Sequence, residues 1–332
     1  MKVVIIEGHW PSLLQDGPTL EREVLGGNVE VVCFGVFPEA EARRHLPDAD
    51  AVISRPGTYL GTPYVALLER CRVIVSLGVG VDHIDLAGAR AKGIPVANVP
   101  DYGTEEVADS AVAMILSHYR RLGAFASAAR MGGGTWDWRL HRPIRRASSQ
   151  RVGIIGLGRI GTAAALRLKA LGFQVGFYDP YLPSGAEKAV GLARHRDLRA
   201  LVRESGIVSI HTPLTAETSG MIDRDFLKAM DADGILVNVS RGKLFRDMDG
   251  VEEILRERPH FRVATDVWPV EPPDEHPLFK AWRAGEPWLG DRLIITPHAA
   301  FFSEEACRDL RVSAARIVAA VLAGGPPDNV VN

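Results

Sequence analysis

The chain has few cysteines, little net charge and no long apolar run, and each shortage excludes a class of protein. Its three cysteines, Cys33, Cys71 and Cys307, are far apart and lack metal-site spacing, so we expect no bound metal and a reducing, cytoplasmic compartment. A formal net charge of -2 gives no electrostatic attraction to nucleic acid or an anionic membrane. No apolar run approaches membrane-spanning length, so no membrane partner is expected.

The remaining composition predicts a globular α/β protein. At 332 residues, 46% hydrophobic and 24% charged, the chain is long enough for two domains. Short apolar runs alternate with helical patterns, which favours parallel sheets. The runs predicted as strands are Val3 to Glu7, Val29 to Phe34, Ala51 to Ser54, Val73 to Ser76, Pro95 to Asn98, Phe173 to Tyr178, Ile207 to His211, Ile235 to Val239, Val263 to Val267 and Leu293 to Thr296.

A glycine-rich loop follows another apolar run, Arg151 to Ile155, and opens onto an amphipathic pattern. Gly156 permits a tight turn, Gly158 lets the backbone approach a pyrophosphate, and Gly161 lets the helix pack closely on the strand. The loop therefore predicts a dinucleotide site. The expected cofactor contacts are Gly156, Gly158, Arg159, Ile160 and Gly161.

Asp179 ends the next predicted strand, about twenty residues after the glycine-rich loop Gly156 to Gly161, which we call the fingerprint. A carboxylate at this position can accept both ribose hydroxyls of the adenosine half. Pro180 and Tyr181 follow it, with no arginine to hold a 2′-phosphate, so the sequence favours NAD over NADP. The alternative is that Asp179 is only a turn residue before proline.

Two Rossmann-like domains follow from the position of the fingerprint, which comes only after a first array of predicted strands. A last helix is expected from Ser303 to Leu322, with Ser303 as its N-cap. No strand of the second array is left for this helix to cover, so we expect it to fold back and close the first domain. That domain is then discontinuous, at 1–98 and 299–332, and the NAD-binding domain occupies 99–298.

A long helical pattern from Glu105 to Arg130 precedes the fingerprint, with Val107, Ala111 and Met114 among its apolar positions. It is either a core helix between the domains or part of a dimerisation arm, and the sequence leaves both open.

Five motifs, taken together and in order, resemble those of the D-2-hydroxyacid dehydrogenase family. They are Ser76 to Asp85, Gly156 to Gly161, Asn238 to Gly242, Asp266 to Pro272 and Thr296 to Ala300. Phe177 to Tyr181 and Phe301 to Glu304 bring the chain closest to the branch of the C-terminal-binding-protein corepressors. The resemblance covers nearly the whole chain. It implies a flavodoxin-like substrate-binding first domain and a homodimer with an arm at 104–145.

The same resemblance implies a catalytic trio of Arg241, Glu271 and His298. A histidine suits the general acid that protonates a developing alkoxide, and a carboxylate on its other ring nitrogen fixes the tautomer. A guanidinium can bind the substrate carboxylate and polarise the carbonyl. Taken singly, each has a plain alternative: a turn histidine, a solvated loop charge and an exposed strand-end cation.

Further cofactor contacts are implied for Asp266, Thr104 and Thr212. The Asp266 carboxylate would hold the nicotinamide carboxamide, or else it is a loop cap.

The substrate carboxylate is expected on backbone amides around Val79 and Gly80, where glycine permits close approach. Phe301 is a further substrate contact implied by the resemblance. Phe301 and Ser76 stand where the corepressor branch has tryptophan and arginine, which weakens any transfer of that branch's substrate.

Arg55 follows a predicted strand where the family's first domain faces the substrate. It is either a pocket cation for a second anionic group on the substrate or a surface side chain. The basic cluster from Arg139 to Arg146 either adds distal contacts or is solvated.

The leading hypothesis is an NAD-dependent oxidoreductase that interconverts a small 2-oxo acid and its D-2-hydroxy acid, with a phosphonate, phosphate or carboxylate as the candidate second anionic group. An NAD(H)-sensing, corepressor-like binding protein without turnover is one alternative. A phosphite-type oxidoreductase is the other.

Overall fold

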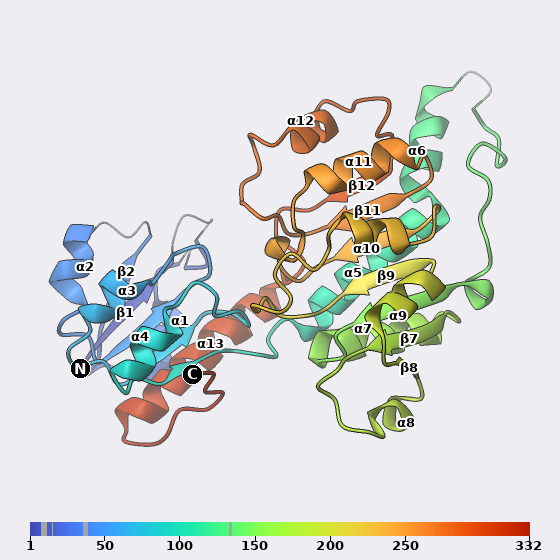
Figure 1. The fold of residues 1–332 in the computed structure, drawn as a ribbon. Coiled ribbons are helices and arrows are strands. Elements are labelled where there is room, and N and C mark those ends of the chain that lie inside the picture. The colour runs from blue at the N-terminus through green and yellow to red at the C-terminus, as the bar shows by residue number, and fades with distance from the viewer. Residues whose placement is uncertain (8–11, 15, 36–38, 133–134) are drawn as a thin grey trace. The chain divides into compact units, whose positions relative to one another are not determined.

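The computed structural model describes residues 1–7, 12–14, 16–35, 39–132 and 135–332. Two compact units divide the chain: Met1–Gly103 with Phe302–Asn332, and Thr104–Phe301. Each unit contains one sheet, and every strand pairing in both sheets is parallel, which confirms the expected α/β class (Figure 1). Within the described residues, no helix is long and apolar enough to cross a bilayer.

The sheet of the first unit has the strand order β2-β1-β3-β4-β5. Its strands are β1 Lys2–Ile6, β2 Glu30–Phe34, β3 Ala51–Ser54, β4 Ile74–Ser76 and β5 Val96–Ala97. Successive side chains of a strand point to opposite faces, so Val3 and Ile5 join one buried cluster while Val4 and Ile6 join another. Both faces of β1 are thus covered, which explains its continuous apolar run.

Helices cover both faces of this first sheet. They are α1 Thr19–Leu25, α2 Glu39–His45, α3 Thr62–Ala66, α4 Leu86–Ala91 and α13 Glu304–Leu322. Leu310 and Val318 of α13 lie in the cluster of Val3 and Ile5. The Ser303 hydroxyl accepts the Ala306 amide at 2.9 Å, as an N-cap does. The C-terminal helix therefore closes the first unit, as predicted.

The sheet of the second unit has the order β12-β11-β10-β9-β6-β7-β8. Its strands are β6 Arg151–Ile155, β7 Gln174–Tyr178, β8 Ala193–His195, β9 Ile207–Ile210, β10 Ile235–Asn238, β11 Arg262–Thr265 and β12 Leu293–Ile295. The chain order reverses between β6 and β9, and open parallel sheets bind ligands beyond the carboxyl ends of the strands at such a point. Strand β8 escaped prediction because its sequence, Ala-Arg-His, contains no apolar run.

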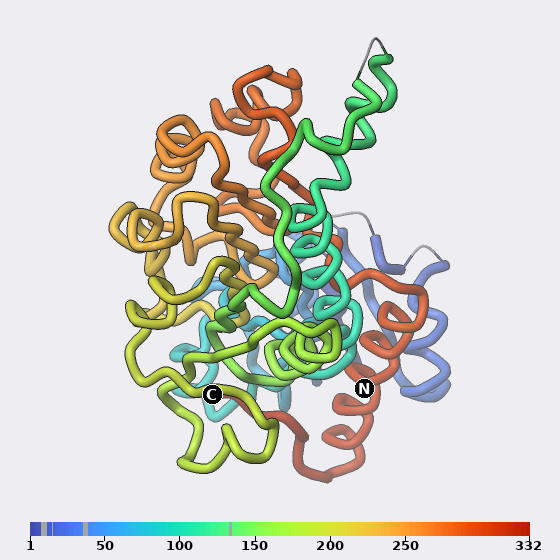
Figure 2. Tube along the Cα trace, turned by 90° about the vertical axis from the view of Figure 1, so that its right-hand side faces the viewer, coloured from blue at the N-terminus to red at the C-terminus, as the bar shows by residue number. Residues whose placement is uncertain are grey.

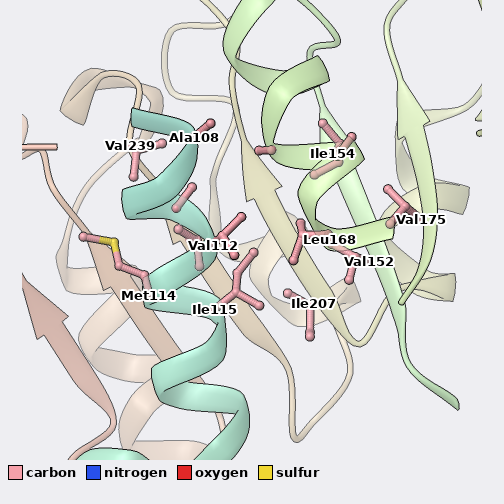
Figure 3. Close-up of a cluster of buried hydrophobic side chains, with 14 of the residues drawn as sticks. Ala108, Val112, Met114, Ile115, Val152, Ile154, Leu168, Val175, Ile207 and Val239 are labelled. Atoms are coloured by element: carbon pink, nitrogen blue, oxygen red, sulfur yellow. The ribbon is translucent and has the colours of Figure 1, made fainter. Parts of the chain in front are cut away.

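One face of this sheet is covered by α5 Thr104–Arg120 and α7 Arg159–Ala170. Figure 3 shows Val112 and Ile115 of α5 and Leu168 of α7 packed in a buried cluster with Val152 and Ile154 of β6. The other face is covered by α9 Leu198–Glu204, α10 Arg224–Ala229, α11 Asp249–Glu257 and α12 Pro277–Arg283. The remaining helices are α6 Leu122–Met131, α8 Ala186–Val190 and the 3-10 turns η1 Ala147–Ser149 and η2 Gly242–Leu244.

The predicted helix from Glu105 to Arg130 is wrong as one element, because it breaks at Arg121. That residue has φ 57° and ψ 36°, in the left-handed region, which cannot continue a right-handed helix. Helix α5 matches the core-helix interpretation, whereas α6 stands out from the rest of the second unit (Figures 1 and 2). Arginine is a good helix former, so the sequence does not mark the break. Within the predicted arm, Gly133 and Gly134 lie outside the described residues.

His118 of α5 is 1% exposed, and its Nε2 lies 3.0 Å from the Val263 carbonyl oxygen. Burial lowers its pKa to about 4. In the unfolded chain the ring takes up a proton near pH 6.5, so the stability it contributes is complete above that pH and falls as the pH drops towards 4. We expect the free energy of unfolding to fall between pH 6.5 and 5.5 by about 1 kcal/mol more in the wild type than in His118→Gln. Urea denaturation at both pH values measures this, and equal losses would contradict the assignment.

Candidate functional site

The fingerprint loop leaves β6 and turns into α7 in a space that only glycine fits. Gly156 has φ +89°, and a Cβ there would lie 2.7 Å from the His211 carbonyl oxygen. A Cβ on Gly161 would lie 2.0 Å from the Gly156 carbonyl oxygen. By contrast, a Cβ on Gly158, the N-cap of α7, would meet no atom within 4 Å. The helix start is therefore open to a ligand, and its amides suit a pyrophosphate.

Asp179 follows β7 and lies against this loop. Its Oδ2 accepts the Leu157 amide at 2.9 Å, and its Oδ1 accepts the Tyr181 amide at 3.0 Å. An ionised carboxylate has about four acceptor positions, so two remain for ribose hydroxyls. The fingerprint and Asp179 therefore lie in direct contact, and their amides and acceptors have the chemistry that the adenosine half of NAD requires.

Arg194 of β8 lies beside Asp179, and sequence reasoning missed it. Its guanidinium donates to the carbonyl oxygens of Asp179, Leu182 and Pro183 at 2.7 to 2.9 Å, and Nη1 lies 3.5 Å from a Glu187 oxygen. The side chain is 9% exposed. Arg194 therefore braces the loop after β7, and its charge is already matched by these groups instead of being directed at a 2′-phosphate.

His298 is held in a loop that follows β12. The residue has φ 52°, a left-handed conformation that the surrounding contacts must enforce. Its amide donates to the Asp266 carbonyl oxygen at 2.8 Å. The Asp266 carboxylate accepts from the Thr296 hydroxyl at 2.5 Å and from the amides of Ala299 and Ala300 at 2.8 and 3.0 Å.

Asp266 is thus an anchor of the loop that carries His298. It is 2% exposed, and burial raises the pKa of its carboxyl above the ordinary value, against the opposing hydrogen bonds from this loop. These contacts match the loop-cap alternative for Asp266. Its contact with the nicotinamide carboxamide stays a prediction.

Glu271 and His298 are in direct contact. Glu271 Oε2 lies 2.8 Å from His298 Nδ1, and Glu271 Oε1 accepts the Trp268 amide at 2.7 Å. Both side chains are partly exposed, at 22% and 26%. A carboxylate fixed at Nδ1 orients the ring and leaves proton exchange with a ligand to Nε2.

Arg241 lies on the loop after β10, which adjoins the segment leading to Glu271. Asn238 shapes this loop, because its side-chain amide donates to the Arg241 carbonyl oxygen at 3.0 Å and its oxygen accepts the Ser240 amide at 3.0 Å. A Cβ on Gly242 would lie 1.8 Å from the Trp268 carbonyl carbon, so glycine is required for the two loops to touch. The supporting roles of Asn238 and Gly242 can be recognised only from the folded structure and not from the sequence.

The two candidate threonines are both half-buried. Thr104 begins α5, and its buried hydroxyl has no hydrogen-bond partner among the described residues. An unpaired buried hydroxyl is the kind of group that an ordered water or a bound ligand satisfies, and the cofactor contact of Thr104 stays a prediction. Thr212 lies beside the fingerprint, since its methyl group would be 3.0 Å from a Cβ on Gly156.

Three further candidates lie in the first unit. The Val79 carbonyl oxygen accepts the Asn98 side chain at 2.7 Å, and the Gly80 carbonyl oxygen accepts the Ser76 hydroxyl at 2.6 Å. Both carbonyls of this loop are thus engaged within the unit. Arg55 is 6% exposed, so it is not a solvated surface side chain. Burial lowers its pKa, which the negative charge of Glu7 opposes.

Phe301 ends the second unit and packs, half-buried, against the cluster that contains α5 and α7. In the basic cluster, Arg139 is exposed and pairs with Asp137 at 2.8 Å. Arg142 lies over the ring of Trp138, with 5.3 Å between the guanidinium carbon and the ring centroid.

The second unit matches a known family. Residues 112–300 match the family model described as "D-isomer specific 2-hydroxyacid dehydrogenase, NAD binding domain". The chain belongs to this family, and NAD is the cofactor of the matched domain. The resemblance to D-2-hydroxyacid dehydrogenases is therefore confirmed, whereas the closer likeness to the corepressor branch stays a prediction.

Two relatives and one solved structure are similar over most of the chain. D-3-phosphoglycerate dehydrogenase of Methanocaldococcus jannaschii is 33% identical over 320 residues, which are 96% of this chain and 58% of that protein. Glyoxylate reductase of Thermofilum pendens is 32% identical over 296 residues, 88% of this chain and 84% of that protein. The D-lactate dehydrogenase of Aquifex aeolicus, solved with NAD and lactic acid, is 26% identical, with a TM-score of 0.82 and coverage of 97% and 96%. The chain thus spans little more than half of the first relative.

Proposed function

We propose that the protein is an NAD-dependent oxidoreductase that interconverts a small 2-oxo acid and its D-2-hydroxy acid. The observation that carries this proposal is the 2.8 Å contact between Glu271 Oε2 and His298 Nδ1, in the unit that also holds the fingerprint and Asp179. A proton donor paired with a carboxylate suits carbonyl reduction next to a nicotinamide. Relatives named as glyoxylate reductase and D-3-phosphoglycerate dehydrogenase support the reaction class.

In this proposal the reduced cofactor supplies hydride to the carbonyl carbon, and the chain handles the proton. His298 donates from Nε2 to the developing alkoxide, while Glu271 stabilises the imidazolium and holds the ring. Arg241 binds the substrate carboxylate and polarises the carbonyl oxygen, because a guanidinium offers two parallel donors. Amides around Val79 and Gly80 complete the carboxylate site. In the opposite direction the imidazole accepts the hydroxyl proton.

The substrate's second anionic group is assigned to Arg55. The test measures NADH oxidation with pairs of 2-oxo acids that differ only in a distal phosphonate, phosphate or carboxylate. We expect the dianionic members to have a higher kcat/KM, and Arg55→Gln to remove that preference while sparing the monoanionic substrates. An equal response in both proteins removes Arg55 from the substrate site. The absence of turnover on every acid, with NADH still bound, contradicts the proposed function itself and favours a sensor.

Asp179→Ala is expected to weaken NADH binding by about 10- to 100-fold, because charged hydrogen bonds to the ribose are lost. Fluorescence titration with NADH measures the affinity, and the melting temperature reports the fold. Glu217→Gln is the matched control, because this nearby carboxylate accepts the Tyr181 hydroxyl and lies outside the proposed ribose site. Equal NADH affinity in wild type and Asp179→Ala would remove Asp179 from the cofactor site.

The functional unit is proposed to be a cytoplasmic homodimer with its arm at 104–145. Support comes from large apolar side chains exposed on and after α6: Leu122 57%, Met131 77%, Trp136 91%, Trp138 72% and Leu140 48%. Apolar groups in such numbers are typical of an interface. Sedimentation velocity tests the dimer, and a species of single-chain mass at micromolar concentration would contradict it.

A further inference from the structure

A cationic cavity lies in the second unit, lined partly by the segment proposed as the dimerisation arm and by none of the residues assigned to catalysis or to the cofactor. Its volume is about 220 Å³. Its ionisable lining residues are Arg121, His141, Arg142, His260, Asp291 and Arg292. Guanidinium and imidazole groups thus surround a space whose lining contains one carboxylate.

Arg121 is the central group of this lining. Its side chain is 8% exposed, yet its guanidinium makes no hydrogen bond to any of the described residues, and the nearest ion-pair contact is 3.9 Å away, at Asp291. Arg121 is also the left-handed residue that breaks α5 from α6. A buried guanidinium held on strained backbone and lacking a hydrogen-bonded acceptor is a costly arrangement, which an anionic ligand would relieve.

The neighbouring charges leave an excess of positive charge. Arg262 is 7% exposed, and its buried Nε has no partner among the described residues. Burial and repulsion from Arg121 lower its pKa to about 10, although Asp291 and Asp233 act in the opposite direction. The cavity lining itself holds three guanidinium groups, of Arg121, Arg142 and Arg292, and one carboxylate, of Asp291. Arg262 and Asp233 add one charge of each sign nearby.

His141 adds an imidazole to the cavity lining. Its Nε2 is buried and has no hydrogen-bond partner among the described residues, while its ring packs edge-on against Phe125 with centroids 4.9 Å apart. Arg292, in contrast, is engaged with backbone, since it donates to the Arg258 and Trp288 carbonyl oxygens. Arg121, His141 and Arg142 are therefore the groups with donors to offer a ligand.

The cavity lies at the opposite end of the strands from the catalytic residues. Arg262 begins β11 and Arg292 immediately precedes β12, whereas Asp266 and His298 follow the other ends of these parallel strands (Figure 1). The length of β11 puts roughly 13 Å between Arg262 and Asp266. An anion in this cavity is thus distinct from a substrate or a cofactor pyrophosphate.

We propose that this cavity binds a compact dianion, a phosphate group or a dicarboxylate, held by Arg121, His141 and Arg142. Guanidinium groups donate pairs of hydrogen bonds to either anion, and the N–H of an imidazole can donate another from a different direction. The site goes beyond the proposed reaction and does not depend on it.

Calorimetric titration with inorganic phosphate, and separately with succinate, tests the proposal. Chloride keeps the ionic strength constant, and saturating NADH occupies the cofactor site. We expect one bound dianion per chain, with affinity at least about 10-fold weaker in Arg121→Asn and in Arg142→Gln, because each change removes a charged hydrogen-bond donor. Asparagine tolerates the left-handed backbone of position 121, so the fold is kept. The stronger of the two ligands identifies the class of dianion.

Two control variants separate this cavity from other cationic sites. Arg139→Gln removes an exposed arginine that pairs with Asp137, and it should leave the affinity unchanged. Arg241→Gln should leave it unchanged as well. Loss of binding in Arg241→Gln would move the anion to the catalytic residues and overturn the proposal. The absence of binding at millimolar concentrations of both dianions would also overturn the proposal. If no anion binds and Arg121→Asn self-associates more weakly than the wild type, the cavity would instead accept a carboxylate of a second copy of the chain.

Discussion

His298→Asn is expected to lower kcat on a 2-oxo acid by about 10²- to 10⁴-fold while NADH affinity changes little. The size follows from the usual contribution of a general acid, because the variant has no group of suitable pKa to protonate the alkoxide. The Asp266 contacts to Thr296, Ala299 and Ala300 do not involve the imidazole, so the loop should remain in place. Stopped-flow turnover and NADH titration measure the two quantities separately.

The matched control is His276→Asn. His276 caps α12, where its Nδ1 accepts the Leu278 amide at 3.2 Å, and asparagine is also a good N-cap. We expect this variant to keep its turnover. Parallel losses of turnover and NADH affinity in His298→Asn would show that His298 has a structural role and is not the proton donor.

Arg311→Ala is expected to lower the free energy of unfolding by about 3 to 5 kcal/mol, the usual cost of removing one partner of a buried ion pair. Arg311 of α13 binds both oxygens of Glu21 of α1 at 2.8 Å, and the two side chains are 8% and 2% exposed. It also donates to the Gly17 carbonyl oxygen at 3.0 Å. The variant leaves the Glu21 carboxylate buried and uncompensated. Urea denaturation followed by circular dichroism measures the loss.

Two comparisons test the buried-pair explanation. The double variant Arg311→Met with Glu21→Leu should recover most of the stability, because no lone charge is left. Arg43→Ala, which breaks the exposed pair with Glu39, should change stability by less than about 0.5 kcal/mol. A similar loss in Arg43→Ala and Arg311→Ala would show that burial of the pair is not the cause.

The sheets could be predicted because their signal is local. An apolar run such as Val3 to Ile6 is buried on both faces, so its pattern survives in the sequence. The break at Arg121 and strand β8 could not be predicted, since each depends on tertiary contacts. Arg194 of β8 lies opposite Phe177 of the neighbouring strand β7, and this pairing of the two strands brings Arg194 to Asp179.

Part of the candidate site could be predicted from the sequence motifs. Glu271 and His298 were expected to share a hydrogen bond, and the structure places them 2.8 Å apart. The supports of the site were not predictable, because the Asn238 side chain acts on the backbone of its own loop, and Gly242 acts where this loop approaches Trp268. Asp266 shows the limit most clearly: its particular contacts with the His298 loop were not foreseen, and its cofactor contact, implied by the family resemblance, stays a prediction.

Asp266 and Glu271, which lie five residues apart, contact the backbone and the ring of His298, so the proposed proton-transfer pair lies within one unit. Residues of the first unit can therefore change during evolution while this contact in the second unit is kept. Under the proposed function, we expect substitutions in the first unit, at positions such as Arg55 or Val79, to alter which acid is recognised without disturbing this contact. New substrates would then arise by changes in the first unit, while the proposed acid-base pair is kept in the second.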